Sequence, residues 1–83
     1  TLDNENPFAW YQLGVVYAQR GDQGRAALAT AERYQLQGRA APLALQHAEM
    51  AMAALPGGSP DWIRAQDIAL VARAEVEQQR KRR

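Results

Sequence analysis

Apolar residues recur three and four positions apart along most of this chain, which is the spacing of an amphipathic helix. The clearest stretch runs from Trp10 to Tyr17, and breaks follow at Gly21, Gly38 and Pro56-Gly57-Gly58. Between these breaks the pattern predicts four helices, over about residues 7–20, 22–37, 42–55 and 60–79. The chain is therefore expected to be all-α.

Residues at the expected helix ends support these boundaries. Asn6 and Asp22 can cap helix N-termini with their side-chain oxygens, and Pro7 stands where a helix needs no N–H donor. Gly38 suits a left-handed helix end, and Ser59-Pro60-Asp61 supplies a new cap, a proline and a first-turn carboxylate. Short connections of about two to six residues require antiparallel neighbours, so we expect two stacked helical hairpins.

One stretch has the spacing of a known repeat. Trp10, Leu13-Gly14 and Tyr17, followed by Ala26, match the opening of a tetratricopeptide repeat (TPR). The first four share one helical face, where Gly14 would let a second helix approach closely with Ala26 as its small partner. The resemblance implies a short right-handed solenoid that binds proteins, with Trp10, Leu13, Gly14, Tyr17 and Ala26 as its packing residues. The alternative is any antiparallel helical hairpin with an aromatic core.

A second, degenerate repeat can be traced in a shifted frame. In this frame residues 22–37 form the first helix of the repeat and residues 42–55 form the second. The second helix then has small residues at Ala44, Ala48 and Ala51, and Pro56 closes the repeat. About three repeats are normally needed for a stable core, and this chain has about two. Either residues 60–79 cap the fold, or parts of a longer parent protein cover its ends. Capping is supported by an inward stripe of Trp62, Ala65, Ala69, Ala72 and Val76.

The first predicted helix also carries a second apolar stripe. Because the first helix of a TPR lines its concave groove, the resemblance implies a partner-binding groove formed by Phe8, Tyr11, Gln12, Val15 and Gln19. The expected occupant is an extended peptide or a partner helix. Equally, the stripe could have packed against a preceding repeat. Tyr11 and Val15 occupy the positions of the Lys and Asn that clamp a C-terminal carboxylate in some TPRs, so no such clamp is expected.

Composition narrows the class of protein. The chain has 83 residues, enough for one small domain, with seventeen alanines that favour helix and no cysteine. The lack of cysteine excludes disulfides and thiolate chemistry. No apolar run is long enough to span a membrane, so we expect no membrane insertion. The first residue is Thr, which suggests a segment of a longer protein.

The C-terminus is a basic tail, residues 80–83, that holds four of the ten Lys and Arg residues. The rest of the chain contains the other six basic residues and all nine Asp and Glu residues, so its net charge is −3 (6 − 9). Cations at a helix C-terminus favour the helix dipole, and we prefer this role for the tail. Binding of nucleic acid or an anionic surface by the tail remains the alternative.

No catalytic or metal-binding motif stands out. His47 is the only histidine, and without cysteine it has no partners for a zinc site, so we expect it on a helix surface or between helices. Met50 and Met52 are expected to fill the core. The sequence therefore predicts no enzyme activity, metal or cofactor for this chain. Because incomplete solenoids can pair their open ends, a weak homodimer is compatible with it.

A closer resemblance covers residues 6–67, about three quarters of the chain. The stretches Asn6-Pro7-Phe8-Ala9-Trp10-Tyr11 and Leu55-Pro56-Gly57-Gly58-Ser59-Pro60-Asp61-Trp62 resemble the C-terminal TPR region of BepA-type bacterial zinc metallopeptidases. In that family an HExxH domain cleaves protein, while the TPR region engages substrates or outer-membrane assembly machinery. This chain contains no HExxH, so the resemblance implies an accessory role in periplasmic protein quality control. A stand-alone TPR scaffold of an unrelated pathway is the alternative.

Overall fold

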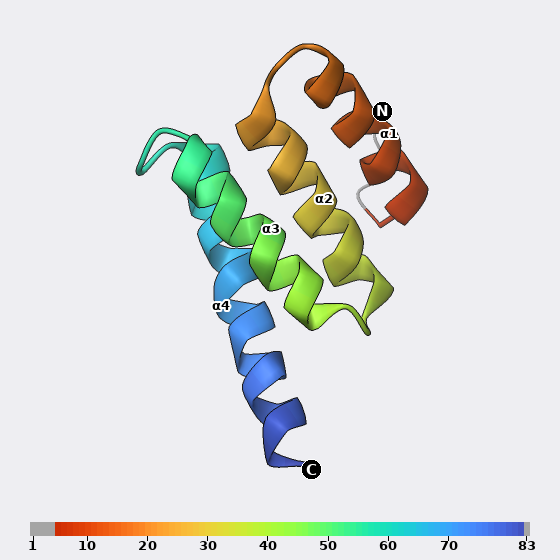
Figure 1. Ribbon diagram of the computed structural model, residues 1–83, viewed down its shortest axis with the longest axis vertical. Coiled ribbons are helices and arrows are strands. Elements are labelled where there is room, and N and C mark those ends of the chain that lie inside the picture. The colour runs from red at the N-terminus through yellow and green to blue at the C-terminus, as the bar shows by residue number, and fades with distance from the viewer. Residues whose placement is uncertain (1–4, 83) are drawn as a thin grey trace.

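The computed structural model describes residues 5–82 and contains four α-helices in that range. They are α1 (Pro7–Gln19), α2 (Gln23–Gln37), α3 (Ala41–Ala54) and α4 (Pro60–Lys81). Figure 1 shows that consecutive helices run in opposite directions, so the all-α prediction is confirmed. The helix ends differ from the predicted ones by at most two residues. The largest difference is at the basic tail, because α4 continues through Arg80 and Lys81, while Arg83 lies outside the described residues.

Three of the four helices begin at a side-chain cap. The Phe8 N–H donates to Asn6 Oδ1 at 2.9 Å, the Arg25 N–H to Asp22 Oδ1 at 3.1 Å, and the Trp62 N–H to Ser59 Oγ at 3.2 Å. The exception is α3, which begins one residue before Pro42 and has no side-chain cap. At the other end of α2, Gly38 adopts a φ of 75°, which side-chain-bearing residues rarely adopt. Local sequence therefore sets most helix ends directly.

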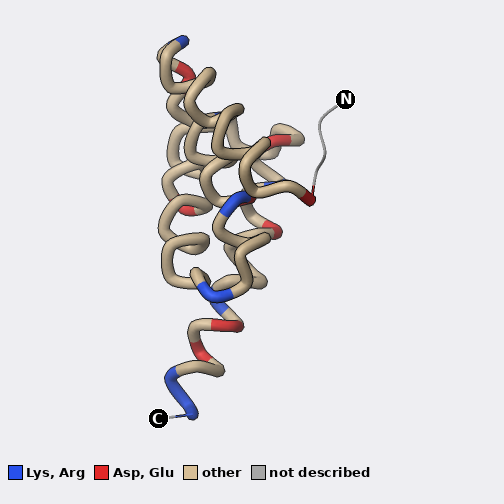
Figure 2. Tube along the Cα trace, turned by 90° about the vertical axis from the view of Figure 1, so that its right-hand side faces the viewer, with Lys and Arg blue, Asp and Glu red and all other residues tan. Residues whose placement is uncertain are grey.

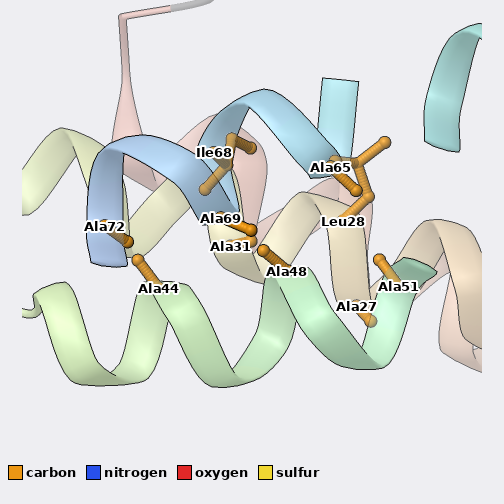
Figure 3. Close-up of a cluster of buried hydrophobic side chains, with 10 residues drawn as sticks. All are labelled: Ala27, Leu28, Ala31, Ala44, Ala48, Ala51, Ala65, Ile68, Ala69 and Ala72. Carbon is orange, nitrogen blue, oxygen red and sulfur yellow. The ribbon is translucent and has the colours of Figure 1, made fainter. Parts of the chain in front are cut away.

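The core lies between α2, α3 and α4 and consists almost entirely of alanine. Figure 3 shows Ala31, Ala48 and Ala69, one from each helix, meeting at its centre. Ile68 is the only large side chain in the described range that is fully buried. Because the distance between packed helices depends on the side chains at the contact, these alanines let the three backbones lie close together.

The inward face of α4 is wider than the predicted stripe. Ala65, Ala69 and Ala72 are buried, and Trp62 and Val76 are only half-buried. The stripe omitted Ile68, which is fully buried. The reason is that α4 packs against both α3 and α2, and two partners cover more of a helix than one.

In contrast to the other helices, α1 lies at the edge and contacts only α2. It has no buried residue, and Trp10, Leu13, Gly14 and Tyr17 are all half-buried. Gly14 faces α2, where an added methyl group would lie 3.7 Å from the Ala26 carbonyl oxygen and 3.6 Å from Ala29 Cβ. These are ordinary contact distances. The approach of α1 to α2 therefore does not require a glycine, contrary to the reason given for Gly14 from the sequence.

The molecule measures 41 × 27 × 19 Å along its principal axes. Its length comes from α4, whose C-terminal half projects beyond the other helices (Figure 1). Figure 2 shows two acidic positions on this projecting part, followed by the basic end. In the part of the chain that the structure describes, no helix combines the length and the apolar character needed to cross a bilayer.

Candidate functional site

An apolar groove lies on the face of α2 that α4 does not cover, between α1 and α3. Its volume is about 390 Å³, and we call it the open groove. It is lined by Tyr11, Gly14, Val15 and Ala18 of α1, by Gln23, Ala26, Ala27, Thr30 and Arg33 of α2, and by His47 and Met50 of α3. No Asp or Glu is among these residues. The groove is thus an apolar surface with one arginine in its wall.

The structure brings only part of the predicted partner-binding set together. Tyr11 and Val15, two of the five residues predicted to form the partner-binding groove, line the open groove. Phe8 instead lines a smaller neighbouring cavity, which we call the end cavity, and its ring stacks on Tyr11 with centroids 6.3 Å apart. Gln12 and Gln19 are exposed and line neither cavity, because their positions on α1 turn them away from α2.

Several groove residues were missed or misjudged from the sequence. Arg33 was not predicted as a site residue, although the spacing of Ala26, Thr30 and Arg33 places them on one face of α2. Met50 was expected in the core but is 50% exposed and lines the groove. The expectation for Met50 is wrong because the core side of α3 is already filled by alanines. Met52 does pack against the core.

Aromatic rings hold Arg33 in place. Its guanidinium carbon lies 5.2 Å from the ring centroid of Tyr11 and 4.6 Å from that of Tyr34, within the range of cation–π attraction. Tyr34 in turn stacks on His47 of α3, with centroids 5.5 Å apart. The Nε of Arg33 is buried and has no hydrogen-bond partner among the described residues. The arginine is therefore positioned by stacking and not by a carboxylate.

His47 lies between helices, one of the two positions expected for it. Burial, and to a smaller extent the charge of Arg33, lowers the pKa of His47 below its ordinary value. The imidazole is therefore neutral near pH 7, and Arg33 is the only ionised side chain of the open groove. Within residues 5–82, no three His, Cys, Asp or Glu side chains are grouped closely enough to hold a metal ion.

A third cavity, of about 280 Å³, lies on the other flank of α1, between α1 and α4. We call it the salt-bridged groove. It is lined by Trp10, Leu13 and Tyr17 of α1, by Arg25, Leu28, Ala29 and Glu32 of α2, and by Asp61 and Arg64 of α4. The repeat-signature side chains of α1 thus line this groove and are not enclosed between α1 and α2.

Charges in the salt-bridged groove are paired. Arg64 donates from Nη2 and Nε to the two carboxylate oxygens of Glu32, at 2.6 and 2.8 Å. This hydrogen bonding raises the pKa of Arg64 above its ordinary value. Arg25 donates from Nε to Asp61 at 3.1 Å and lies 5.9 Å from the Tyr17 ring centroid. Both ion pairs join α2 to α4, so this groove stabilises the fold.

The basic end of α4 forms no comparable site. Arg80 Nη1 lies 3.5 Å from Glu77 Oε1 on the same helix, and Glu75 and Glu77 precede the basic end (Figure 2). The end of α4 therefore carries mixed charge up to its last turn.

Comparisons with known proteins assign no relative. No protein-family model matches this chain, and no significant match is found among curated proteins or solved structures.

Proposed function

We propose that this chain is a non-catalytic protein-interaction module that binds a peptide segment of a partner protein in the open groove. The supporting observation is the groove itself. Tyr11, Val15 and Met50 keep between 40% and 50% of their surface exposed around a cavity of about 390 Å³. Apolar and aromatic cavities of this size with a few polar groups are typical of ligand sites. Exposed apolar surface of this kind also marks protein-interaction sites.

The contacts of α2 favour the shifted frame of the proposed repeat. α2 packs along α3 and also contacts α4, whereas α1 contacts α2 alone. This is the order expected if α2 and α3 form one hairpin and α4 begins the next. In that frame α1 would be the second helix of a preceding hairpin. The groove proposal does not depend on this choice, because the open groove is formed by α1, α2 and α3 in either frame.

For the cellular role, our proposal follows the resemblance to the TPR region of BepA-type metallopeptidases. The chain would recruit a client or an assembly partner in the periplasm, as the accessory region of a zinc metallopeptidase. An HExxH motif in the same open reading frame would support this role. A parent protein without such a motif would leave a TPR scaffold of another pathway.

Two neighbouring valines of α1 provide a test of the groove. Val15 and Val16 are 40% and 39% exposed, but only Val15 lines the open groove. In a pull-down from a bacterial envelope lysate, Val15→Arg should lose partners that the wild-type chain retains, because a charged side chain would enter the groove. Val16→Arg is the matched control and should retain them. If both variants keep every partner, the open groove is not the docking surface.

A further inference from the structure

The open groove and the end cavity are adjacent, and Arg33 lies where they meet. Tyr11 and Arg33 line both cavities. The open groove extends to Ala18, and the end cavity extends to Pro7 at the other end of α1. At 1.5 Å per helical residue this trough is about 16 Å long, the length of about five residues of extended peptide. An occupant of the whole trough therefore passes Arg33 near its own middle.

The charge of the trough is unbalanced. Neither cavity is lined by an Asp or Glu, whereas Arg25, Arg64 and Arg73 each lie within 3.3 Å of a carboxylate oxygen. Arg33 has no carboxylate partner in the described part of the chain, although it is partly buried and its Nε is fully so. A buried donor without an acceptor is unfavourable, and a charged acceptor is its strongest partner. Arg33 thus lacks the counter-charge that Arg25, Arg64 and Arg73 have.

Arg33 is also pre-positioned to bind. Tyr11 of α1 and Tyr34 of α2 both contact its guanidinium, and Tyr34 is itself stacked on His47. A side chain held in this way loses little conformational entropy when a ligand arrives. Because Nε is buried, a ligand would meet the terminal nitrogens of the guanidinium. These can take a carboxylate in a bidentate arrangement.

We infer that the trough recognises an extended segment of a partner protein that has one Asp or Glu in the middle and apolar residues on both sides. The carboxylate pairs with Arg33, and the apolar side chains occupy the two cavities. A chain terminus would place its carboxylate at Arg33 but fill only one cavity. This inference rests on the proposed function, since it specifies what the peptide-binding groove prefers.

Three short peptides test it by NMR titration of the full chain. The first is acetyl-Leu-Ala-Glu-Ala-Leu-amide, in which both leucines lie on the same side of an extended chain as the Glu. The second has Gln in place of Glu. The third, acetyl-Ala-Leu-Ala-Leu with a free carboxylate, represents a chain terminus. The Glu peptide should shift the methyl signals of Val15 and Met50 and bind about tenfold more tightly than the Gln peptide, as expected for one charged hydrogen-bonded pair.

Two arginine variants assign the preference to Arg33. Arg33→Met should remove the preference for Glu, so that this variant binds the Glu and Gln peptides equally well. Arg25→Met is the matched control, because Arg25 also belongs to α2 and also lies over a tyrosine of α1, but on the other flank. It should keep the preference. In the wild-type chain, raising the salt concentration should reduce the preference as well, which tests the charge without any substitution.

The outcomes separate this inference from the proposed function. Equal binding of the Glu and Gln peptides would overturn the inference and leave peptide binding in place. Equal or tighter binding of the free-terminus peptide would overturn the assignment to an internal acidic residue. If none of the peptides shifted trough signals up to about 10 mM, both the inference and the proposed function would fail.

Discussion

The two grooves that flank α1 contain similar side chains, but they differ in whether their arginines are paired with a carboxylate. In each of them an arginine of α2 lies over a tyrosine of α1, Arg25 over Tyr17 and Arg33 over Tyr11. In the salt-bridged groove Arg25 also meets a carboxylate of α4. In the open groove no Asp or Glu is among the described lining residues, and Arg33 lies against the rings of Tyr11 and Tyr34.

This difference separates the groove whose charges are paired within the fold from the groove that we propose as the binding surface. Glu32 and Arg33 are neighbours in sequence, yet Glu32 is satisfied by Arg64 within the fold while Arg33 has no such partner. A satisfied pair gains little from a ligand, whereas an unpaired cation beside apolar surface gains both an ion pair and apolar contact. Paired charges join α2 to α4 in the salt-bridged groove, and the unpaired Arg33 is the reason for proposing the open groove as the partner-binding one.

Of the substitutions that test this comparison, Arg64→Met is expected to have the largest effect on the stability of the chain. The Glu32 side chain is only 11% exposed, so removing Arg64 leaves a nearly buried carboxylate without its bidentate partner. We expect the free energy of unfolding to fall by about 2 kcal/mol, measured by urea denaturation. Arg33→Met is the matched variant and should change stability by less than about 0.5 kcal/mol, since the loss of cation–π contact is offset by removal of an unpartnered donor. Equal losses in the two variants would refute the distinction between the grooves.

A smaller effect, of opposite sign, is expected from Gly14→Ala on the face of α1 that meets α2. Because the added methyl group would meet no atom closer than 3.6 Å, alanine should stabilise the chain by about 0.5 to 1 kcal/mol through its higher helix propensity. The measurement is thermal denaturation followed by circular dichroism.

Gly24→Ala is the control for this substitution, since its methyl group would come within 2.8 Å of Leu55 Cδ2. It should give a smaller gain or a loss. Destabilisation by Gly14→Ala would instead mean that α1 lies closer to α2 than the structure shows.

The smallest effect on stability is expected from mild acid, which protonates His47 and so adds a second positive charge beside Arg33. Because the pKa of His47 is lowered in the fold, the unfolded chain binds more protons between that lowered pKa and about 6.5. Stability should therefore fall as the pH falls through this window and be independent of His47 above it. Urea denaturation between about pH 7.5 and 5.5 measures this slope. His47→Gln should reduce it, and an unchanged slope would show that His47 does not contribute.

Local sequence was sufficient for the helices and their ends. Asn6, Asp22, Ser59 and Gly38 act through atoms within three residues of themselves, so their roles could be predicted without knowing the fold. The candidate site was predicted only in part. Tyr11 and Val15 share a face of α1 and line the open groove, whereas Gln12 and Gln19 line neither the open groove nor the end cavity.

The sequence by itself determined the four helices, their antiparallel order and the small residues through which three of them pack. These properties follow from spacing, capping and side-chain size, which act over short distances along the chain. Only the tertiary structure decided that α1 is an edge helix, that Met50 faces a groove and that Arg33 stacks on Tyr11 without a carboxylate. The physical reason is that the spacing of residues along a helix shows which side chains share a face. It does not show which face of another helix, charged or apolar, packs opposite them.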